Sequence, residues 1–357
     1  MHKLGLTRFA VVALIAASFA VLASAFAAPA AKGVQVVADE AHRRVDITID
    51  GAAFTSYIWP TTLKKPVLYP IIDADGDTIT RGYPLEVRPG ERVDHPHHAG
   101  LWFNYQATNG FDFWNNSDAI KPEQRPKMGS ILQTGVVSTK SGADRGELVV
   151  ESVWVTGDDK QILDQTTRYV FMRRGHARVI DEVITLKALD QAVFKDAKDG
   201  LFGLRVASWL ESPEEKGGIF LDASGNPTKV DAAPAGGPRP ASGEYLTSEG
   251  VKGTAAWATR GRWCALTGHT GSHTVTVAII DNPANPGYPT YWHARGYGLF
   301  AANPLGRSVF DPKQPPLNFT LEKGQSAVFR YRIVLDSKAA NPEELNRDAD
   351  SFAREYK

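Results

Sequence analysis

Cysteine is nearly absent from this sequence: Cys264 is the only one among 357 residues. A single cysteine cannot form an intramolecular disulfide, so packing must stabilise the fold without covalent cross-links. Its neighbours Trp263 and Ala265 are apolar, and an activated thiol needs an exposed, electropositive setting. We therefore expect Cys264 to be a buried residue with no catalytic role.

Net charge is absent as well, because 40 basic residues balance 40 acidic ones. Such a chain has no bulk attraction for nucleic acid or anionic lipid, so neither is expected as a partner. The sequence also lacks a Gly-x-Ser-x-Gly elbow, a Gly-rich phosphate loop, a His-Glu-x-x-His motif and a Cys-x-x-Cys pair. These absences argue against a serine esterase, a nucleotide enzyme, a zincin and a zinc finger.

Long apolar runs are missing beyond the N-terminus. The one such run, Phe9 to Phe26, follows a short basic start and ends in the small-x-small pattern Ala25-Phe26-Ala27. This arrangement predicts a signal peptide over residues 1–27 and a periplasmic or secreted protein. No later run approaches the roughly 18–20 apolar residues that span a bilayer, so no membrane span is expected after signal removal.

Strand patterns dominate the remaining chain. Apolar residues alternate with polar ones at 45–49, 275–279 and 327–335, which is the period of a strand with one solvated face. Longer β-rich runs cover 131–139, 147–156, 161–173, 177–189 and 201–210. Because no helical period separates them, we predict an all-β fold, with residues 28–357 forming a single domain that is a large antiparallel β-sandwich.

One short helix is predicted, near the C-terminus. Asn341 is a suitable N-cap, and Pro342 suits the first helical turn. Leu345, Ala349 and Phe352 then fall on one face, which would cover a sheet.

Two irregular segments are also predicted. Residues 222–242 are rich in Gly, Pro, Ala and Asp, which indicates a long surface loop. Asp73, Asp75 and Asp77 suggest a calcium loop, but Gly76 and Pro84 do not occupy the positions that such a loop requires. A hairpin turn with solvated acids is the better interpretation.

Histidines concentrate in the segment Asp94-His95-Pro96-His97-His98, which holds three of the nine. Pro96 favours an extended residue before it, so we expect His95 and His97 to project to one side and His98 to the other. His95 and His97, joined by His293 or Asp94, could bind one divalent metal ion. Without a metal, all four histidines could act as catalytic acids and bases or contact a substrate. A third interpretation is structural, with the imidazoles bonded to backbone groups of a buried loop.

Aromatic and arginine side chains accompany these histidines. Aromatic faces pack against the C–H faces of sugar rings, although a β core needs aromatic residues too. Arginine can hold carboxylates or hydroxyls. The candidate substrate-binding residues are Arg81, Trp102, Trp114, Trp292, Arg295, Tyr297 and Asn303.

Several segments together resemble a family of secreted bacterial proteins often labelled PmoA-like: 80–84, 94–103, 109–114, 281–283, 292–295 and 302–306. The label points to a methane monooxygenase subunit, but such subunits are multi-span helical proteins, unlike this chain. The resemblance therefore implies a protein of sugar-utilising bacteria. The pattern also looks like the galactose-mutarotase-type β-supersandwich, in which an arginine and neighbouring histidines contact a sugar. Arg81 and the histidines 95 to 98 would match those roles.

The sequence thus predicts a carbohydrate-active enzyme, a hydrolase, lyase or epimerase that acts on a sugar or sugar acid. Arg81 and Arg295 would hold polar or acidic substrate groups, while His97, His98 and His293 handle protons or a metal. The alternatives are a non-catalytic carbohydrate-binding protein and, following the family label, a metal-dependent oxidoreductase. Sequence alone does not choose among the carboxylates that could join the histidines: Glu151, Asp181, Glu182, Glu211 and Asp281.

Overall fold

A computed structural model describes residues 32–213, 216–232 and 240–357. Residues 31–357 form one compact unit. The predicted signal peptide, residues 1–27, lies outside the described residues. Within the described ranges, no helix is long and apolar enough to cross a bilayer.

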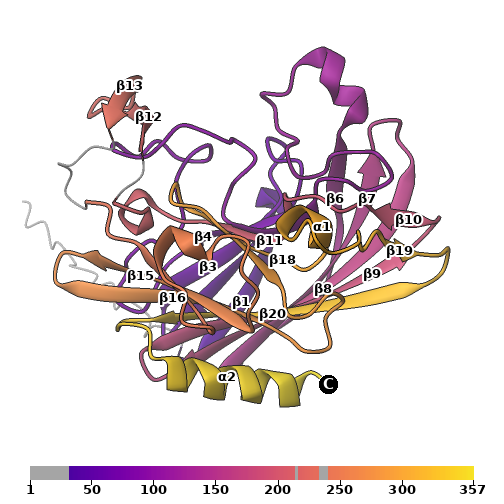
Figure 1. The fold of residues 1–357 in the computed structure, drawn as a ribbon. Helices are drawn as coiled ribbons and strands as arrows, with labels where there is room; N and C mark the ends of the chain where they lie inside the picture. Colours follow the sequence, from indigo (N-terminus) through magenta and orange to yellow (C-terminus); the bar gives the residue numbers. More distant parts are fainter. Residues whose placement is uncertain (1–31, 214–215, 233–239) are drawn as a thin grey trace, which may run out of the picture. The chain divides into compact units, whose positions relative to one another are not determined.

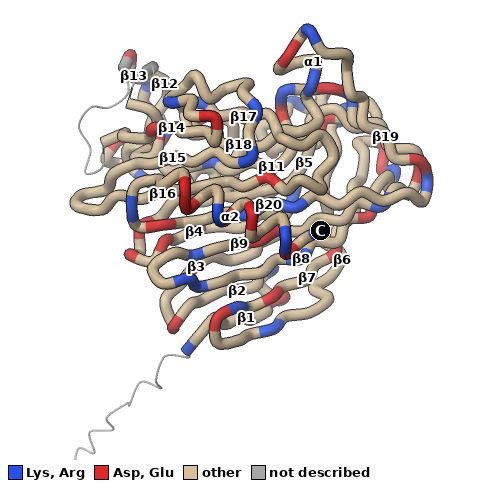
Figure 2. The backbone as a smooth tube through the Cα atoms, turned by 60° about the horizontal axis from the view of Figure 1, so that its bottom comes forward, with Lys and Arg blue, Asp and Glu red and all other residues tan. Residues whose placement is uncertain are grey.

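Two eight-stranded antiparallel sheets account for most of the described chain. In spatial order, the first sheet consists of β1 (Val34–Asp39), β2 (Arg44–Ile49), β3 (Ala52–Ile58), β4 (Val67–Ile71), β5 (Leu101–Tyr105), β11 (Gly200–Arg205), β18 (Leu299–Asn303) and β17 (Tyr291–Ala294). Figure 2 shows these strands from β1 at the bottom to β17 near the top, with Lys, Arg, Asp and Glu scattered among them.

The second sheet consists of β14 (Glu244–Thr247), β15 (Trp263–Thr270), β16 (His273–Asp281), β20 (Ser326–Asp336), β9 (Ala177–Ala188), β8 (Gln161–Arg174), β7 (Arg145–Thr156) and β6 (Gly129–Lys140). Two small hairpins pair β10 (Ala192–Phe194) with β19 (Phe319–Leu321) and β12 (Lys216–Leu221) with β13 (Pro227–Ala232). The short helices are η1 (Glu40–His42), η2 (Pro122–Lys127), η3 (Ser208–Leu210), η4 (Gly253–Ala256) and α1 (Arg307–Phe310).

The main core lies between the two sheets. Phe103, Phe202 and Trp292 occupy one cross-strand row of the first sheet and belong to this core, together with Phe329 and Tyr331 of β20. The alternation read in residues 327–335 therefore faces the core as predicted, and the large antiparallel β-sandwich is confirmed. Cys264 is also buried in this core, and burial raises the pKa of its thiol.

Helix α2 (Pro342–Glu355) confirms the predicted C-terminal helix. The Asn341 side chain accepts from the backbone N–H groups of Glu343 and Glu344, as an N-cap should. Its buried residues Leu345, Ala349 and Phe352 pack in one cluster with residues of β8, β9, β15, β16 and β20. Figure 1 shows α2 beneath the second sheet, with the long connections of the first sheet on the opposite side.

Three local expectations were wrong. The strand expected over 201–210 ends at Arg205 and is followed by η3. The loop expected over 222–242 contains β13, although residues 233–239 lie outside the described ranges. Residues 73–77 form the expected turn, but Asp73 and Asp77 are buried because Asp73 accepts backbone N–H groups of Asp75 and Asp77.

Candidate active site

Four rings form a stacked column against the outer face of the first sheet. Trp102, on β5, stacks on His98 with ring centroids 5.3 Å apart. His98 stacks on His95 at 4.8 Å, and His95 stacks on Tyr297 at 5.2 Å. We call these four residues the aromatic column. Separations of this size are normal for attractive ring pairs.

A tight turn gathers the three clustered histidines. His95 adopts a φ of 42°, and the backbone N–H of His98 donates to the His95 carbonyl at 2.9 Å. The buried Arg81 guanidinium braces this turn by donating to the carbonyls of His95 and His98 at 3.1 and 3.0 Å. The expected extended arrangement, with His98 pointing away from His95, is therefore wrong.

Asp94 connects this turn to two arginines. Its Oδ1 accepts hydrogen bonds from Arg81 and, at 2.7 Å, from Arg205. Its Oδ2 lies 3.0 Å from His95 Nδ1. Burial alone would raise the pKa of Asp94, but the His95 hydrogen bond and the charges of Arg205 and Arg81 hold it well below its usual range. Asp94 is therefore a carboxylate at neutral pH.

His95 is the exposed member of the histidine cluster, with 42% of its side chain open to solvent. Its Nδ1 is directed at Asp94, so a neutral ring carries its proton there and leaves Nε2 as an acceptor. An imidazole oriented by a carboxylate in this way can accept a proton from a bound molecule.

His97 and His98 are buried and stay neutral. Burial, with help from the charge of Lys65, lowers the pKa of His97 to about 2. Burial and neighbouring His97 and Arg205 hold the pKa of His98 far below its usual value. Trp114 Nε1 donates to His98 Nε2 at 3.1 Å, and Arg205 Nη1 lies 3.4 Å from its Nδ1. A second ring proton on His98 would have no acceptor. We therefore expect His98, within the aromatic column, and His97, beside it, to have a packing role and not to transfer protons.

Lys65 closes the inner end of the column. Its ammonium lies 5.1 Å from the Trp102 ring centroid and donates to the His97 carbonyl at 2.6 Å. The side chain is buried, and burial lowers its pKa to about 7, opposed by the charge of Asp112. No pattern in the sequence suggested a role for Lys65.

Arg205, which the sequence did not single out, and Glu211 are further site residues. Arg205 lies 5.0 Å from the Tyr297 ring centroid, and its Nη2 lies 3.9 Å from Glu211 Oε1. Glu211 is one of five carboxylates that the sequence left open. Burial raises its pKa to about 7, against the charges of Arg205 and Arg92. A lone arginine within the apolar strand 200–206 was the available signal.

His293 lies apart from the column. A single cross-strand row runs through Trp102, Gly203, Ala301 and His293. At normal strand spacing, the backbones of Trp102 and His293 are therefore roughly 14 Å apart. The His293 ring bonds through Nδ1 to the Lys198 carbonyl at 2.9 Å, and burial lowers its pKa to about 4. The segments that contain Trp102 and His293 thus meet on one face of the first sheet, but His293 does not join Asp94 and His95.

The residues present do not fit a metal ion. Within the described ranges, no group of three or more His, Cys, Asp or Glu side chains is arranged to hold one. Arg81 and Arg205 already occupy Asp94, and these guanidiniums together with Lys65 surround the histidines with positive charge. The predicted ligand set of His95, His97 and His293 is therefore not assembled.

Two predicted substrate-binding residues have structural positions instead. Trp292 alternates with His293 along β17 and is fully buried between the sheets. Asn303 is also buried: its Nδ2 donates to the carbonyls of Ala197 and Lys198, and its Oδ1 accepts from the Leu305 N–H. Asn303 and His293 thus both fix the connection that precedes β11, and the Trp292 ring, whose Nε1 has no hydrogen-bond partner among the described residues, lies in the core between the sheets.

Arg295 and Tyr297 lie at the rim of the site. Arg295 is exposed, with its guanidinium carbon 5.7 Å from the Tyr297 ring centroid and 5.9 Å from that of Trp257. Trp257 is 39% exposed and Tyr297 is half-buried, so both can offer ring surface to a ligand. Trp102 and Trp114, by contrast, are 2% and 1% exposed and shape the site from beneath.

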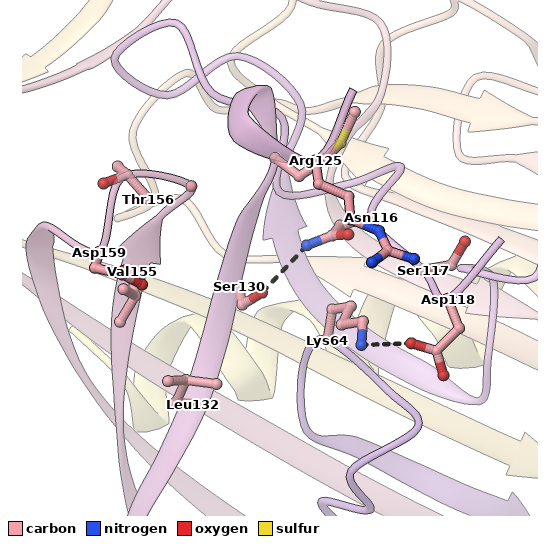
Figure 3. A pocket seen from close by; sticks show the side chains of 12 residues that line it. Lys64, Asn116, Ser117, Asp118, Arg125, Ser130, Leu132, Val155, Thr156 and Asp159 are labelled. Atoms are coloured by element: carbon pink, nitrogen blue, oxygen red, sulfur yellow. Dashed lines mark hydrogen bonds and ion pairs between the residues drawn. The ribbon is translucent and has the colours of Figure 1, made fainter. Parts of the chain in front are cut away.

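Two adjoining hollows share Lys64, and one of them is also lined by Lys65. One, of about 410 Å³, is lined by Lys65 together with Trp59, Lys64, Ser130 and Leu132 among others. The second, of about 360 Å³, shares Lys64, Ser130 and Leu132 with it (Figure 3). There Asn116 donates to Ser130 at 3.1 Å, and Lys64 pairs with Asp118 at 2.5 Å. The first of these hollows therefore borders Lys65, the residue that closes the column.

Residues 44–350 match the model of DUF6807, a family of unknown function. No match to a curated protein sequence is found.

Several solved structures are similar over most of the chain. The galactosidase domain of an alpha-galactosidase-sucrose kinase has a TM-score of 0.40 and 8% identity, over 85% of this chain and 41% of that one. GH36 alpha-galactosidase AgaB from Geobacillus stearothermophilus has a TM-score of 0.36 and 11% identity, over 85% and 40%. A provisionally named aldose 1-epimerase from Escherichia coli K12 has a TM-score of 0.32 and 9% identity, over 85% and 99%. The chain spans about two-fifths of these galactosidase chains, and likenesses at these TM-scores assign it no activity.

Proposed function

The chain belongs to the DUF6807 family of unknown function, and from its site we propose that it is a carbohydrate-active enzyme that moves a proton on a sugar. The observation that carries this proposal is the exposed His95 imidazole, directed by the Asp94 carboxylate at 3.0 Å. The signal peptide predicted over residues 1–27 would deliver the activity to the periplasm or outside the cell.

The Asp94–His95 pair has the parts of a general base. Arg81 and Arg205 keep Asp94 ionised, and Asp94 in turn sets the tautomer and orientation of His95. A negative charge that develops on the substrate would be stabilised by nearby guanidinium groups, because electrostatic stabilisation is strongest where donors are already fixed.

A sugar fits the rim better than a flat apolar molecule does. The ring surfaces of Tyr297 and Trp257 can pack against C–H groups, while Arg295 and His95 can bond to hydroxyls. This combination of aromatic faces and polar donors supports the carbohydrate proposal.

Of the three reaction classes, epimerisation and elimination are favoured over hydrolysis. Glycoside hydrolysis usually uses two carboxyl groups that flank the scissile bond. Here Asp94 is committed to two arginines and His95, and Glu211 is only 3% exposed. A single oriented imidazole is suited to removing a proton from a ring carbon or hydroxyl.

Incubation of the mature protein with a panel of sugars, followed by NMR of the products, tests the proposal. We expect conversion by the wild type and a loss of about 100-fold or more in His95→Gln, with binding retained in calorimetry. His176→Gln, at an exposed position in the β8–β9 turn, is the matched control and should convert sugar normally. Binding without conversion by the wild type would show a non-catalytic carbohydrate-binding protein instead.

A further inference from the structure

Arg295 is an exposed arginine held by rings instead of by acids. Its guanidinium lies over Tyr297 and Trp257, and no ion pair or hydrogen bond joins it to another described residue. Arg295 therefore presents an uncommitted, planar donor group at the rim of the site.

The interior of the site does not cancel this charge. Arg81 and Arg205 share the single carboxylate of Asp94. The second described acid beside Arg205 is Glu211, whose pKa is raised to about 7 by burial, so it is only partly ionised near neutral pH. Arg92 also pairs with Glu211 at 3.3 Å, and Asp199, another carboxylate that acts on Tyr297, pairs with Lys198 at 3.1 Å. These carboxylates already have cationic partners, so the guanidinium of Arg295 can attract an anionic ligand.

We propose that the substrate is a sugar acid of the hexuronate class and that Arg295 binds its carboxylate. This inference rests on the proposed function. Guanidinium and carboxylate groups match in a bidentate geometry. Tyr297 is the shared neighbour of Arg295 and His95, with contacts of 5.7 and 5.2 Å to its ring. A carboxylate bound by Arg295 and the carbon next to it would therefore both lie close to Tyr297.

The chemistry of a uronate suits this arrangement. Its C5–H bond is next to the carboxylate, so His95 Nε2 can take the C5 proton while the bonding electron pair moves into the carboxylate to form an enediolate. Arg295 stabilises the added negative charge. Return of the proton from the imidazole to the face it left gives back the uronate; a proton taken from water on the opposite face gives the C5 epimer, and the imidazolium then loses its proton to the hydroxide that remains. Atoms and electrons balance without a co-reactant.

Deuterium exchange with matched sugars tests this inference. The methyl glycosides of D-glucuronate and D-galacturonate are compared in heavy water with those of D-glucose and D-galactose, and binding is measured in parallel by calorimetry. We expect exchange at C5 of a uronate and no exchange of the matching hexose. Arg295→Gln should lower kcat/KM at least about tenfold, the usual effect of losing a charged hydrogen bond. Arg347→Gln, on exposed α2, should have no effect.

The outcomes separate the two proposals. If hexoses exchange as fast as uronates, or if Arg295→Gln is as active as Arg347→Gln, the uronate inference fails while proton transfer stands. If uronates bind in an Arg295-dependent way without exchange or conversion, the catalytic proposal fails while carboxylate recognition stands. If none of these sugars binds or exchanges, the hexuronate assignment is wrong. Arg295→Lys, which keeps the charge but not the planar fork, should bind with intermediate affinity and guards against a folding defect in Arg295→Gln.

Discussion

Replacing Asp94 with Asn should destabilise the protein, because this carboxylate is shared by two buried arginines. The side chains of Arg81 and Arg205 are 0% exposed, whereas that of Asp94 is 26% exposed. Removing one partner of a buried ion pair costs about 3–5 kcal/mol. Since Asp94 is partly solvated, we expect a loss near the lower end, about 3 kcal/mol in the free energy of unfolding.

Urea denaturation and thermal melting measure this loss. For a chain of this length, about 3 kcal/mol corresponds to a fall in Tm of about 4 °C. Asp118→Asn is the matched control: Asp118 pairs with Lys64 at 2.5 Å but is 63% exposed. A surface pair of this kind contributes at most about 1 kcal/mol.

The pH dependence gives a second check. The pKa of Asp94 is lowered in the folded protein, so the folded state binds its proton less tightly than the unfolded chain does. The stability that Asp94 provides is therefore complete above the ordinary carboxyl pKa of about 3.9 and is lost as the pH falls below it. The reasoning is refuted if Asp94→Asn is as stable as Asp118→Asn at neutral pH.

Three further variants test the packing and titration of buried groups. Lys65→Met should gain stability relative to the wild type as the pH falls from about 10.5 to about 7, because the lysine pKa is lowered to about 7 by burial; pH-dependent denaturation measures it. Glu182→Gln should gain relative stability as the pH rises from about 4.5 to about 8, since burial raises this carboxyl pKa to about 8; a flat difference between the two proteins would contradict this. Gly203→Ala should lose about 1–3 kcal/mol and alter near-UV circular dichroism, because its Cβ would lie 2.6 Å from the Trp102 ring, whereas Gly135→Ala meets no atom within 4 Å.

Local sequence patterns were sufficient for much of the fold. The alternation in β16 and β20 follows directly from a sheet with one core-facing side. The Asn341 cap and the apolar face of α2 are likewise encoded within a few neighbouring residues. Boundaries that depend on distant packing were less accessible: nothing in residues 201–210 indicates that β11 ends at Arg205, where the chain turns away from the sheet.

For the same reason, the sequence identified several residues of the candidate site but not their arrangement. The histidine segment, Arg81 and Tyr297 could be named because they cluster in motifs. Their geometry could not, since Arg81 holds Asp94 and the carbonyls of the left-handed His95 and of His98 through contacts across 13 to 17 positions. Sequence position also failed to separate Trp292 from His293, because adjacent residues on a strand face opposite sides of the sheet.

The central claim is that His95, directed by Asp94, transfers a proton at a sugar carbon. The most direct measurement is the rate at which the wild type and His95→Gln incorporate deuterium from heavy water into a ring C–H of a bound sugar. The account predicts measurable incorporation by the wild type and a decrease of about 100-fold or more in His95→Gln. Equal rates in the two proteins, or no incorporation by the wild type with any sugar that it binds, would contradict it.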